Sequence, residues 1–182
     1  NCYACIANDI FVAMKADSTT SSHPHVAKRT ITVPSYIRGL MSFLEFLHWR
    51  LALYVALKLF LTPIKFPIPK RELSTRRDAN KLIIPLKERE ALLYHWGTGD
   101  KKVVLMHGWS GRASQFFRLI ERLVEEGFHV YAVEGPAHGE SKYKRSNMLE
   151  FASAIEWTHT NHGPFYAGIG HSLGSMALFN AH

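Results

Sequence analysis

The chain has 182 residues, of which 47% are hydrophobic, 20% charged and 12% aromatic. This composition allows one domain with a sizeable core and excludes a disordered chain, a collagen and a coiled coil. The formal net charge of +7 would suit nucleic acid or an anionic membrane, but the excess lies in residues 1–90, with fourteen basic and seven acidic side chains. Residues 91–182 carry eight of each. We therefore expect no nucleic-acid partner.

Residues 1–35 are expected to be a disordered or non-native leader. The chain begins at Asn1, its first methionine is Met14, and the stretch after it is polar. The two cysteines, Cys2 and Cys5, lack the second pair that a zinc site needs, so no metal is expected. Residues 1–30 also lack the basic, apolar and small segments of a secretory signal in their usual order.

Residues 36–62 are predicted to form one apolar helix. Its apolar side chains recur at helical spacing: Leu40, Phe43, Leu44, Leu47, Leu51, Tyr54 and Val55. Glu45, Arg50 and Lys58 interrupt any window of about 20 residues, which disfavours a membrane-spanning helix. Either the helix packs on the domain that follows, or residues 36–61 make a peripheral membrane contact. We expect a cytoplasmic protein, associated with the inner face of the membrane in the second case.

Residues 63–80 are predicted to be a linker, because three prolines stop the helix and a charged stretch follows. From residue 81 to residue 182, short apolar runs alternate with helical patterns. Residues 82–86 and 91–96 are expected to pair as a hairpin. Three strand–helix units follow, with strands at 103–106, 128–133 and 165–169. This order predicts an α/β domain with a mostly parallel sheet and helices on both faces.

The third strand and its helix meet at Gly170-His171-Ser172-Leu173-Gly174, which fits the pattern G-x-S-x-G. A serine on such a sharp turn has a strained backbone and a hydroxyl that projects above the sheet. The N-terminus of the following helix favours the negative charge that develops in acyl transfer. The position of the motif, more than its letters, makes it specific.

A second motif, His107-Gly108-Trp109-Ser110-Gly111, follows the first strand of the alternation. Loops at the C-terminal ends of parallel strands share one edge of the sheet, so this loop and the serine turn are expected to face each other. A glycine-containing loop there can turn a backbone N–H toward a substrate carbonyl.

Together with Glu134-Gly135-Pro136-Ala137-His138-Gly139-Glu140-Ser141 after the next strand, these motifs resemble the α/β-hydrolase family, from about Lys81 to the last residue. The resemblance implies that Ser172 is the nucleophile and that the backbone N–H groups of Leu173 and Trp109 are the oxyanion donors. His107, Gly108, Gly170 and Gly174 would support the two motifs. Glu134 stands where aspartate is common, a change expected to affect loop geometry. Residues 107–116 and the pair at 62–63 also resemble an uncharacterised bacterial subgroup.

The resemblance implies a serine hydrolase, lipase-like or carboxylesterase-like, that cleaves an ester or related acyl bond of a small-molecule substrate without cofactor or metal. The triad acid and histidine are expected after residue 182, so the chain would be the N-terminal part of a C-terminally truncated domain, inactive alone. Alternatives are an acyltransferase or a carbon–carbon hydrolase on the same fold, or a non-catalytic scaffold that docks on a membrane or protein. An aspartate nucleophile is argued against by Ser172.

Among the histidines, His107 and His138 are the only serious candidates for a base within the chain, although their counterparts in the family shape loops. Glu134 and Glu140 are interpreted as members of a solvated loop rather than as an acid–base pair. The strand at 165–169 would have an unpaired outer edge, which predicts aggregation of the isolated chain.

Overall fold

The computed structural model describes residues 3–7, 10–12 and 33–181, with side chains for 33–181. The chain divides into two compact units. We call residues 15–61 the hairpin unit, and residues 1–14 with 62–182 the sheet unit. The described part of the hairpin unit contains α1 (Ser35–Leu47) and α2 (Trp49–Phe60).

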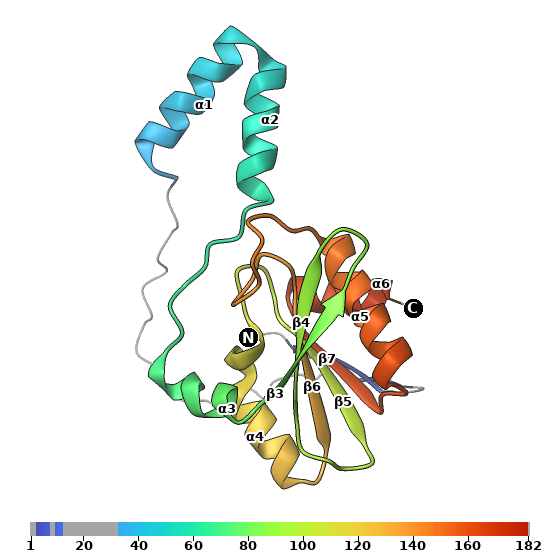
Figure 1. Ribbon diagram of the computed structural model, residues 1–182. Coiled ribbons are helices and arrows are strands. Elements are labelled where there is room, and N and C mark those ends of the chain that lie inside the picture. Colours follow the sequence, from blue (N-terminus) through green and yellow to red (C-terminus); the bar gives the residue numbers. More distant parts are fainter. Residues whose placement is uncertain (1–2, 8–9, 13–32, 182) are drawn as a thin grey trace, which may run out of the picture. The chain divides into compact units, whose positions relative to one another are not determined.

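The sheet unit is built on a mixed sheet whose described strands follow the order β2-β1-β7-β5-β6-β4-β3 (Figure 1). The strands are β1 (Tyr3–Ala7), β2 (Ile10–Val12), β3 (Asn80–Pro85), β4 (Glu90–Trp96), β5 (Lys102–Met106), β6 (His129–Glu134) and β7 (Ala167–His171). Parallel pairing is confined to the centre, where β5 pairs with β6 and with β7. The expected α/β fold is therefore confirmed, but the described sheet is mixed instead of mostly parallel, with antiparallel strands on both sides of a parallel centre. The expected hairpin is β3 with β4.

Helices cover both faces of this sheet (Figure 1). Their bounds are η1 (Lys70–Glu72), α3 (Leu73–Arg77), η2 (Ala113–Phe116), α4 (Phe117–Glu125), α5 (Met148–His162) and α6 (Leu173–Asn180). On one face, Phe116 and Ile120 of η2 and α4 pack on the sheet. On the other, Phe151 of α5 and Leu178 of α6 form a second core cluster.

The period-two alternation of the strands explains why there are two core clusters. In β6, Val130 and Ala132 belong to the cluster under α4, while Tyr131 and Val133 belong to the cluster under α5 and α6. Because successive side chains of a strand point to opposite faces, a strand buried on both faces needs apolar residues at every position. The continuous apolar runs read from the sequence meet this requirement.

The first twelve residues contain strands, which differs from the expected leader. β1 pairs antiparallel with β2 and with β7, and Cys5 lies opposite Ile169. The outer edge of β7 therefore has a neighbour, contrary to the expectation of an unpaired edge. Cys2 and most of the expected leader lie outside the described residues.

The predicted single helix is two helices. The backbone at His48 is extended, with φ −167° and ψ 117°, and its ring Nδ1 accepts the N–H of Arg50 at 3.2 Å. This contact satisfies an N–H at the start of α2 that has no partner within the helix. Among the described residues, no helix combines the length and hydropathy needed to cross a bilayer.

The predicted linker is part of the sheet unit, whose boundary lies at Thr62. η1 and α3 form within residues 63–80, and Glu72 and Thr75 are buried. Trp96 of β4 donates its indole N–H to the carbonyl of Thr75 at 2.6 Å. The sequence misled us here because two charged residues of this stretch, Glu72 and Arg76, are largely buried and are paired inside the unit.

Candidate active site

Ser172 stands at the turn between β7 and α6, as predicted. Its φ of 52° and ψ of −118° lie where a side chain is strained, at a cost of about 1–3 kcal/mol. The residue is exposed, so its hydroxyl is accessible. Among the described non-glycine residues, positive φ occurs also at Ser110 and Ala137. All three residues lie in the loops that follow the parallel strands β5, β6 and β7, which makes this edge of the sheet the candidate site.

The two glycines of the serine motif allow the turn to close. A side chain on Gly174 would overlap the carbonyl oxygens of Met106 and His107, so the first turn of α6 can pack against the end of β5 only with glycine there. A Cβ on Gly170 would lie 2.5 Å from the backbone nitrogen of Ser175. Real Cβ atoms do not come this close to backbone atoms. Any residue other than glycine at either position would therefore clash, which explains the two glycines of the motif.

The loop after β5 touches the serine turn. A Cβ on Gly108 would lie 2.9 Å from the Nδ1 of His171 and 3.2 Å from the Cβ of Ser172. The loop turns back on itself, since Gly111 donates its N–H to the carbonyl of Gly108 at 2.9 Å. The predicted meeting of the two motifs is therefore what the structure shows.

The two proposed oxyanion donors flank this contact. Leu173 is the first residue of α6, where a backbone N–H has no acceptor within its own helix. Trp109 follows Gly108 and is half-buried, with its ring edge-to-face against His138 at 5.0 Å between centroids. The catalytic use of both N–H groups stays a prediction.

The contacts of His107 explain how it supports the loop. Its ring is fully buried, and its Nε2 accepts the N–H of Gly135 at 3.1 Å. The other ring nitrogen, Nδ1, therefore carries the proton and donates to the carbonyl of Gly108 at 2.8 Å. Burial lowers the pKa of His107 to about 4. A neutral ring with both nitrogens engaged joins the loops after β5 and β6 and has no site left for a proton from serine.

His138 is similarly buried in the loop after β6. Its Nδ1 donates to the carbonyl of Pro136 at 2.9 Å, and its Nε2 has no hydrogen-bond partner among the described residues. Burial, followed by repulsion from the neighbouring His107 ring when that ring is protonated, lowers its pKa to about 4. Its ring packs against Trp109 and Phe151. These contacts fit a role in shaping the loop better than a role as general base.

Glu134 is not part of a solvated loop, which corrects the sequence interpretation. The residue is fully buried at the end of β6. One carboxylate oxygen accepts the N–H of Ala113 at 3.2 Å, and the other accepts the N–H of Glu140 at 2.8 Å. The carboxylate thus ties the loop after β5 to the loop after β6.

Glu140 is also paired. Its carboxylate binds Arg76 at 2.9 Å and Lys81 at 2.6 Å, and Arg76 lies 3.6 Å from Glu134. Hydrogen bonds from Arg76 and Lys81 lower the pKa of Glu140 to about 2. Both carboxylates are therefore committed to structural contacts, which argues against an acid–base pair.

Sequence reasoning missed Glu72, a buried residue of η1 that holds the loop after β5. Its carboxylate accepts hydrogen bonds from Arg112 at 2.6 and 2.9 Å and from the hydroxyl of Ser114 at 2.9 Å. Burial alone would raise the pKa of Glu72, but the hydrogen bonds from Arg112 and Ser114 outweigh it and lower the pKa. A charged residue in a charged stretch, far along the chain from Arg112, gives no signal of such a contact.

The segment before η1 borders the same loops. Ile64 donates its N–H to the hydroxyl of Ser110 at 3.0 Å, and Lys65 donates to the carbonyl of Ser141. A cavity of about 40 Å³ lies between residues 64–68 and these loops, with His138 in its wall. This volume suits a water molecule better than an acyl chain. Within the described residues, no cluster of histidine, cysteine and acidic side chains could hold a metal ion.

Comparison with known proteins agrees with this geometry. Residues 103–181 match the model of the Alpha/beta hydrolase family. Over 81 residues, the chain is 32% identical to the pimeloyl-[acyl-carrier protein] methyl ester esterase of Sodalis glossinidius, covering 44% of this chain and 30% of that protein.

Solved structures are similar in fold. The thioesterase domain from the curacin biosynthetic pathway is 21% identical with a TM-score of 0.50, covering 54% of this chain and 39% of that one. Epoxide hydrolase A from Mycobacterium thermoresistibile is 22% identical with a TM-score of 0.47, covering 57% of this chain and 34% of that one. The chain spans about a third of the length of these relatives. The family match over residues 103–181, the strand order and the contact between the two motifs together show that the sheet unit has the alpha/beta hydrolase fold.

Proposed function

We propose that this chain carries the nucleophile and the oxyanion-binding loop of a serine hydrolase that cleaves an ester or related acyl bond. The observation that carries the proposal is the exposed, strained Ser172 in contact with Gly108. A protein keeps such strain where the position of a side chain matters for function. The esterase similarity supports the same class of substrate.

The proposed reaction proceeds in two steps. The oxygen of Ser172 attacks the acyl carbon while its proton passes to a histidine, and the carbonyl oxygen becomes an anion. The N–H groups of Leu173 and Trp109 stabilise that anion, and the N-terminal end of α6 adds favourable partial charge. The bond to the alcohol then breaks, the histidine gives its proton to the departing oxygen, and the acyl group stays on Ser172. Water attacks this acyl-enzyme while the histidine takes its proton, the acid leaves, and the histidine returns the proton to the serine oxygen.

The base is not assigned to a histidine of residues 33–181. His107 has both ring nitrogens engaged, and burial holds its pKa and that of His138 near 4. We propose that the histidine and its carboxylate partner follow residue 182 in the full-length protein, as the family resemblance implies, and the test below therefore uses that protein.

A fluorophosphonate probe tests the proposal on the full-length protein. We expect covalent labelling of Ser172 and ester hydrolysis, both abolished by Ser172→Ala. The matched control is Ser153→Ala, because Ser153 is also exposed and lies within α5, where alanine is well tolerated. Labelling that persists in Ser172→Ala would refute the assignment, and absence of labelling in the wild type would favour a non-catalytic scaffold.

A further inference from the structure

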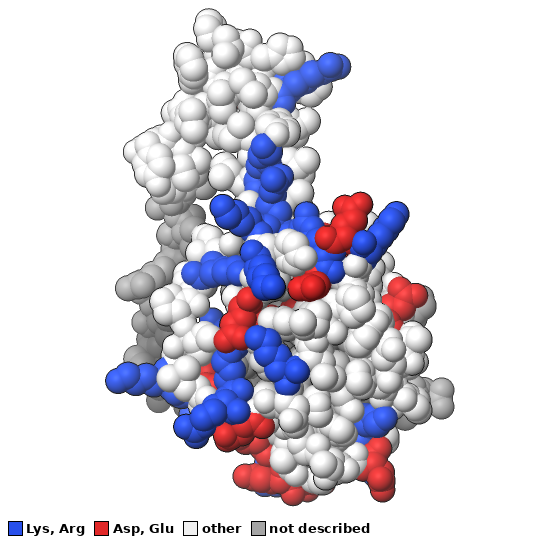
Figure 2. Space-filling model, in the orientation of Figure 1, with Lys and Arg blue, Asp and Glu red and all other residues white. Residues whose placement is uncertain are grey.

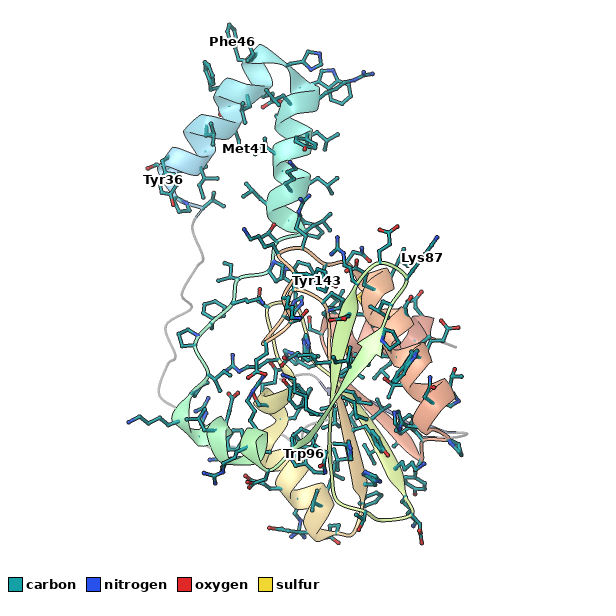
Figure 3. The ribbon with its side chains drawn as sticks, viewed as in Figure 1. Tyr36, Met41, Phe46, Lys87, Trp96 and Tyr143 are labelled. Carbon is teal, nitrogen blue, oxygen red and sulfur yellow. The ribbon has the colours of Figure 1, made fainter. Side chains whose placement is uncertain are left out.

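The hairpin unit exposes nearly all of its large apolar side chains. Among the residues of α1 and α2, only Ala52 is buried. Phe46 is 90% exposed, Phe60 75% and Tyr36 74%. At least half exposed are also Leu40, Phe43, Leu47, Trp49, Leu53, Tyr54, Leu57 and Leu59. Figure 3 shows Phe46 at the end of α1, with its ring pointing away from the helix pair.

This surface is more apolar than the surfaces that soluble proteins usually expose to water. Soluble proteins rarely expose apolar patches beyond a few hundred Å², and larger patches mark a binding surface. The apolar residues of α1 and α2 lie on more than one side of each helix, so packing the two helices together leaves most of them uncovered. An occupant that can accept apolar groups over a broad area is required.

We propose that the hairpin unit lies in the interfacial region of an anionic lipid bilayer, as a monotopic anchor. The two helices have 13 and 12 residues, or about 20 and 18 Å at 1.5 Å per residue. The hydrocarbon core of a bilayer is about 30 Å thick, so neither helix spans it. Helices of this length with exposed aromatic and leucine side chains are suited to lying at the boundary of headgroups and acyl chains.

The charges of the hairpin favour an anionic surface. Residues 36–61 contain Arg38, Arg50 and Lys58 against the single acid Glu45. Figure 2 shows these helices as white surface interrupted by blue side chains. A second copy of the hairpin would bring like charges together, whereas anionic headgroups would neutralise them.

The aromatic side chains also favour a position at the level of the lipid headgroups. Arg50 lies over the ring of Trp49 at 5.4 Å, and Lys58 lies over the ring of Tyr54 at 4.1 Å. Tryptophan and tyrosine are enriched at the level of lipid headgroups, where the ring is apolar on one side and polar on the other. A cation beside each ring places positive charge at the same level as the phosphates.

Vesicle sedimentation tests the proposal with the whole chain. We expect the protein to bind vesicles of phosphatidylglycerol and phosphatidylcholine more tightly than vesicles of phosphatidylcholine alone, with weaker binding at high salt. Replacing two exposed aromatic residues in Phe43→Gln/Phe46→Gln should weaken binding at least tenfold, because each buried phenylalanine contributes about a factor of ten or more. The matched control is Leu149→Gln, which removes a side chain that is 70% exposed on α5.

The fluorescence of Trp49 gives an independent readout. Anionic vesicles should shift the tryptophan emission to shorter wavelength, and Trp49→Phe should remove the shift while binding persists. Circular dichroism of each variant checks that the helices remain formed, which we expect because the replaced side chains are solvent-exposed.

Three results would overturn the proposal. One is the absence of vesicle binding by the folded wild-type chain, and another is equal loss of binding in the Leu149→Gln control. The third is a dimer that dissociates in Phe43→Gln/Phe46→Gln without vesicle binding by the wild type, because a second copy would then be the occupant. The test does not depend on the chemistry of Ser172, so its failure would leave the proposed hydrolase function untouched.

Discussion

At the scale of single residues, strain is concentrated where the chemistry is proposed. Ser110, Ala137 and Ser172 have positive φ, and each lies in a loop that follows a parallel strand. Serine and alanine have no special tolerance for this region, unlike glycine. Their conformations persist because surrounding contacts hold them, such as the hydrogen bond from Ile64 to the hydroxyl of Ser110.

The strain at Ser172 predicts an order of stabilities. Ser172→Gly relieves the unfavourable φ of 52°, whereas Ser172→Ala retains it. We expect the glycine variant to be more stable than the alanine variant by about 1 kcal/mol, after allowing for the greater flexibility of glycine in the unfolded chain. Urea denaturation of both variants measures the difference. Equal midpoints would mean that the turn is relaxed and that the argument from strain fails.

The contact at Gly108 predicts a defect in activity. A methyl group there would meet the ring nitrogen of His171 at 2.9 Å and push the loop away from Ser172. In the full-length protein, Gly108→Ala should lower the rate of ester hydrolysis by about a hundredfold, the effect of losing one oxyanion donor. Gly127→Ala serves as a control, because a Cβ on Gly127 has open space although its φ of 79° adds strain. A rate reduced equally in both variants would point to general destabilisation.

At the scale of elements, η1 and α3, which precede β3, bind the loops of the candidate site through side-chain ion pairs. Glu72 of η1 binds Arg112 and Ser114, and Arg76 of α3 binds Glu140. These contacts join the first part of the sheet unit to the loops that follow β5 and β6. The stretch is therefore an integral part of the candidate site.

Glu72→Ala is predicted to be strongly destabilising. The side chains of Glu72 and Arg112 are 3% and 13% exposed, so the variant would leave Arg112 as a buried, unpaired charge. We expect a loss of at least about 3 kcal/mol in the free energy of unfolding and a slower reaction of Ser172 with the fluorophosphonate probe. Chemical denaturation measures the first effect and single-exponential labelling the second.

The exposed ion pair of Glu126 and Arg122 is a control for the buried pair of Glu72 and Arg112. Glu126 binds Arg122 at 2.5 Å, but these side chains are 53% and 68% exposed. Glu126→Ala should change stability by less than about 1 kcal/mol. If the two alanine variants proved equally stable, the buried pair at Glu72 would contribute nothing beyond a surface contact.

The sequence predicts features that depend on neighbouring residues, but it does not predict contacts between residues far apart in the chain. The β3–β4 hairpin, the three strand–helix units and the turn at Ser172 follow from apolar periodicity and turn residues within short windows. The pairing of β1 with β7 and the contacts of Glu72 join residues far apart in sequence, for which one sequence carries no signal. The break at His48 was missed because the apolar pattern continues across it.

At the scale of the whole molecule, buried histidines couple stability to pH. Burial holds the pKa of His107 and His138 near 4 in the folded chain, against about 6.5 in the unfolded chain. Burial also lowers the pKa of His95, His129 and His162. The unfolded chain therefore binds more protons than the folded chain over this range, and the free energy of unfolding falls as pH decreases.

We expect the sheet unit to lose several kcal/mol of stability between pH 6.5 and pH 4. Each fully buried histidine can contribute up to about 3 kcal/mol over this window, from 1.36 kcal/mol per pKa unit. Below about pH 4.5, Glu140 takes up a proton in the unfolded chain but not in the folded chain, where its pKa is lowered to about 2, and this difference adds to the loss. Urea denaturation at a series of pH values measures the slope.

Replacing His138 tests whether this residue contributes to the fall in stability at low pH. His138→Gln removes a titrating ring while retaining a side-chain donor for the carbonyl of Pro136. The variant should be less stable than the wild type at pH 7, because glutamine cannot replace the ring packing, but its stability should fall less steeply toward pH 4. His159→Gln, which replaces an exposed residue of α5, should retain the wild-type slope. Parallel curves for all three proteins would mean that His138 is protonated as easily in the folded chain as in the unfolded one, which its burial beside His107 makes unfavourable.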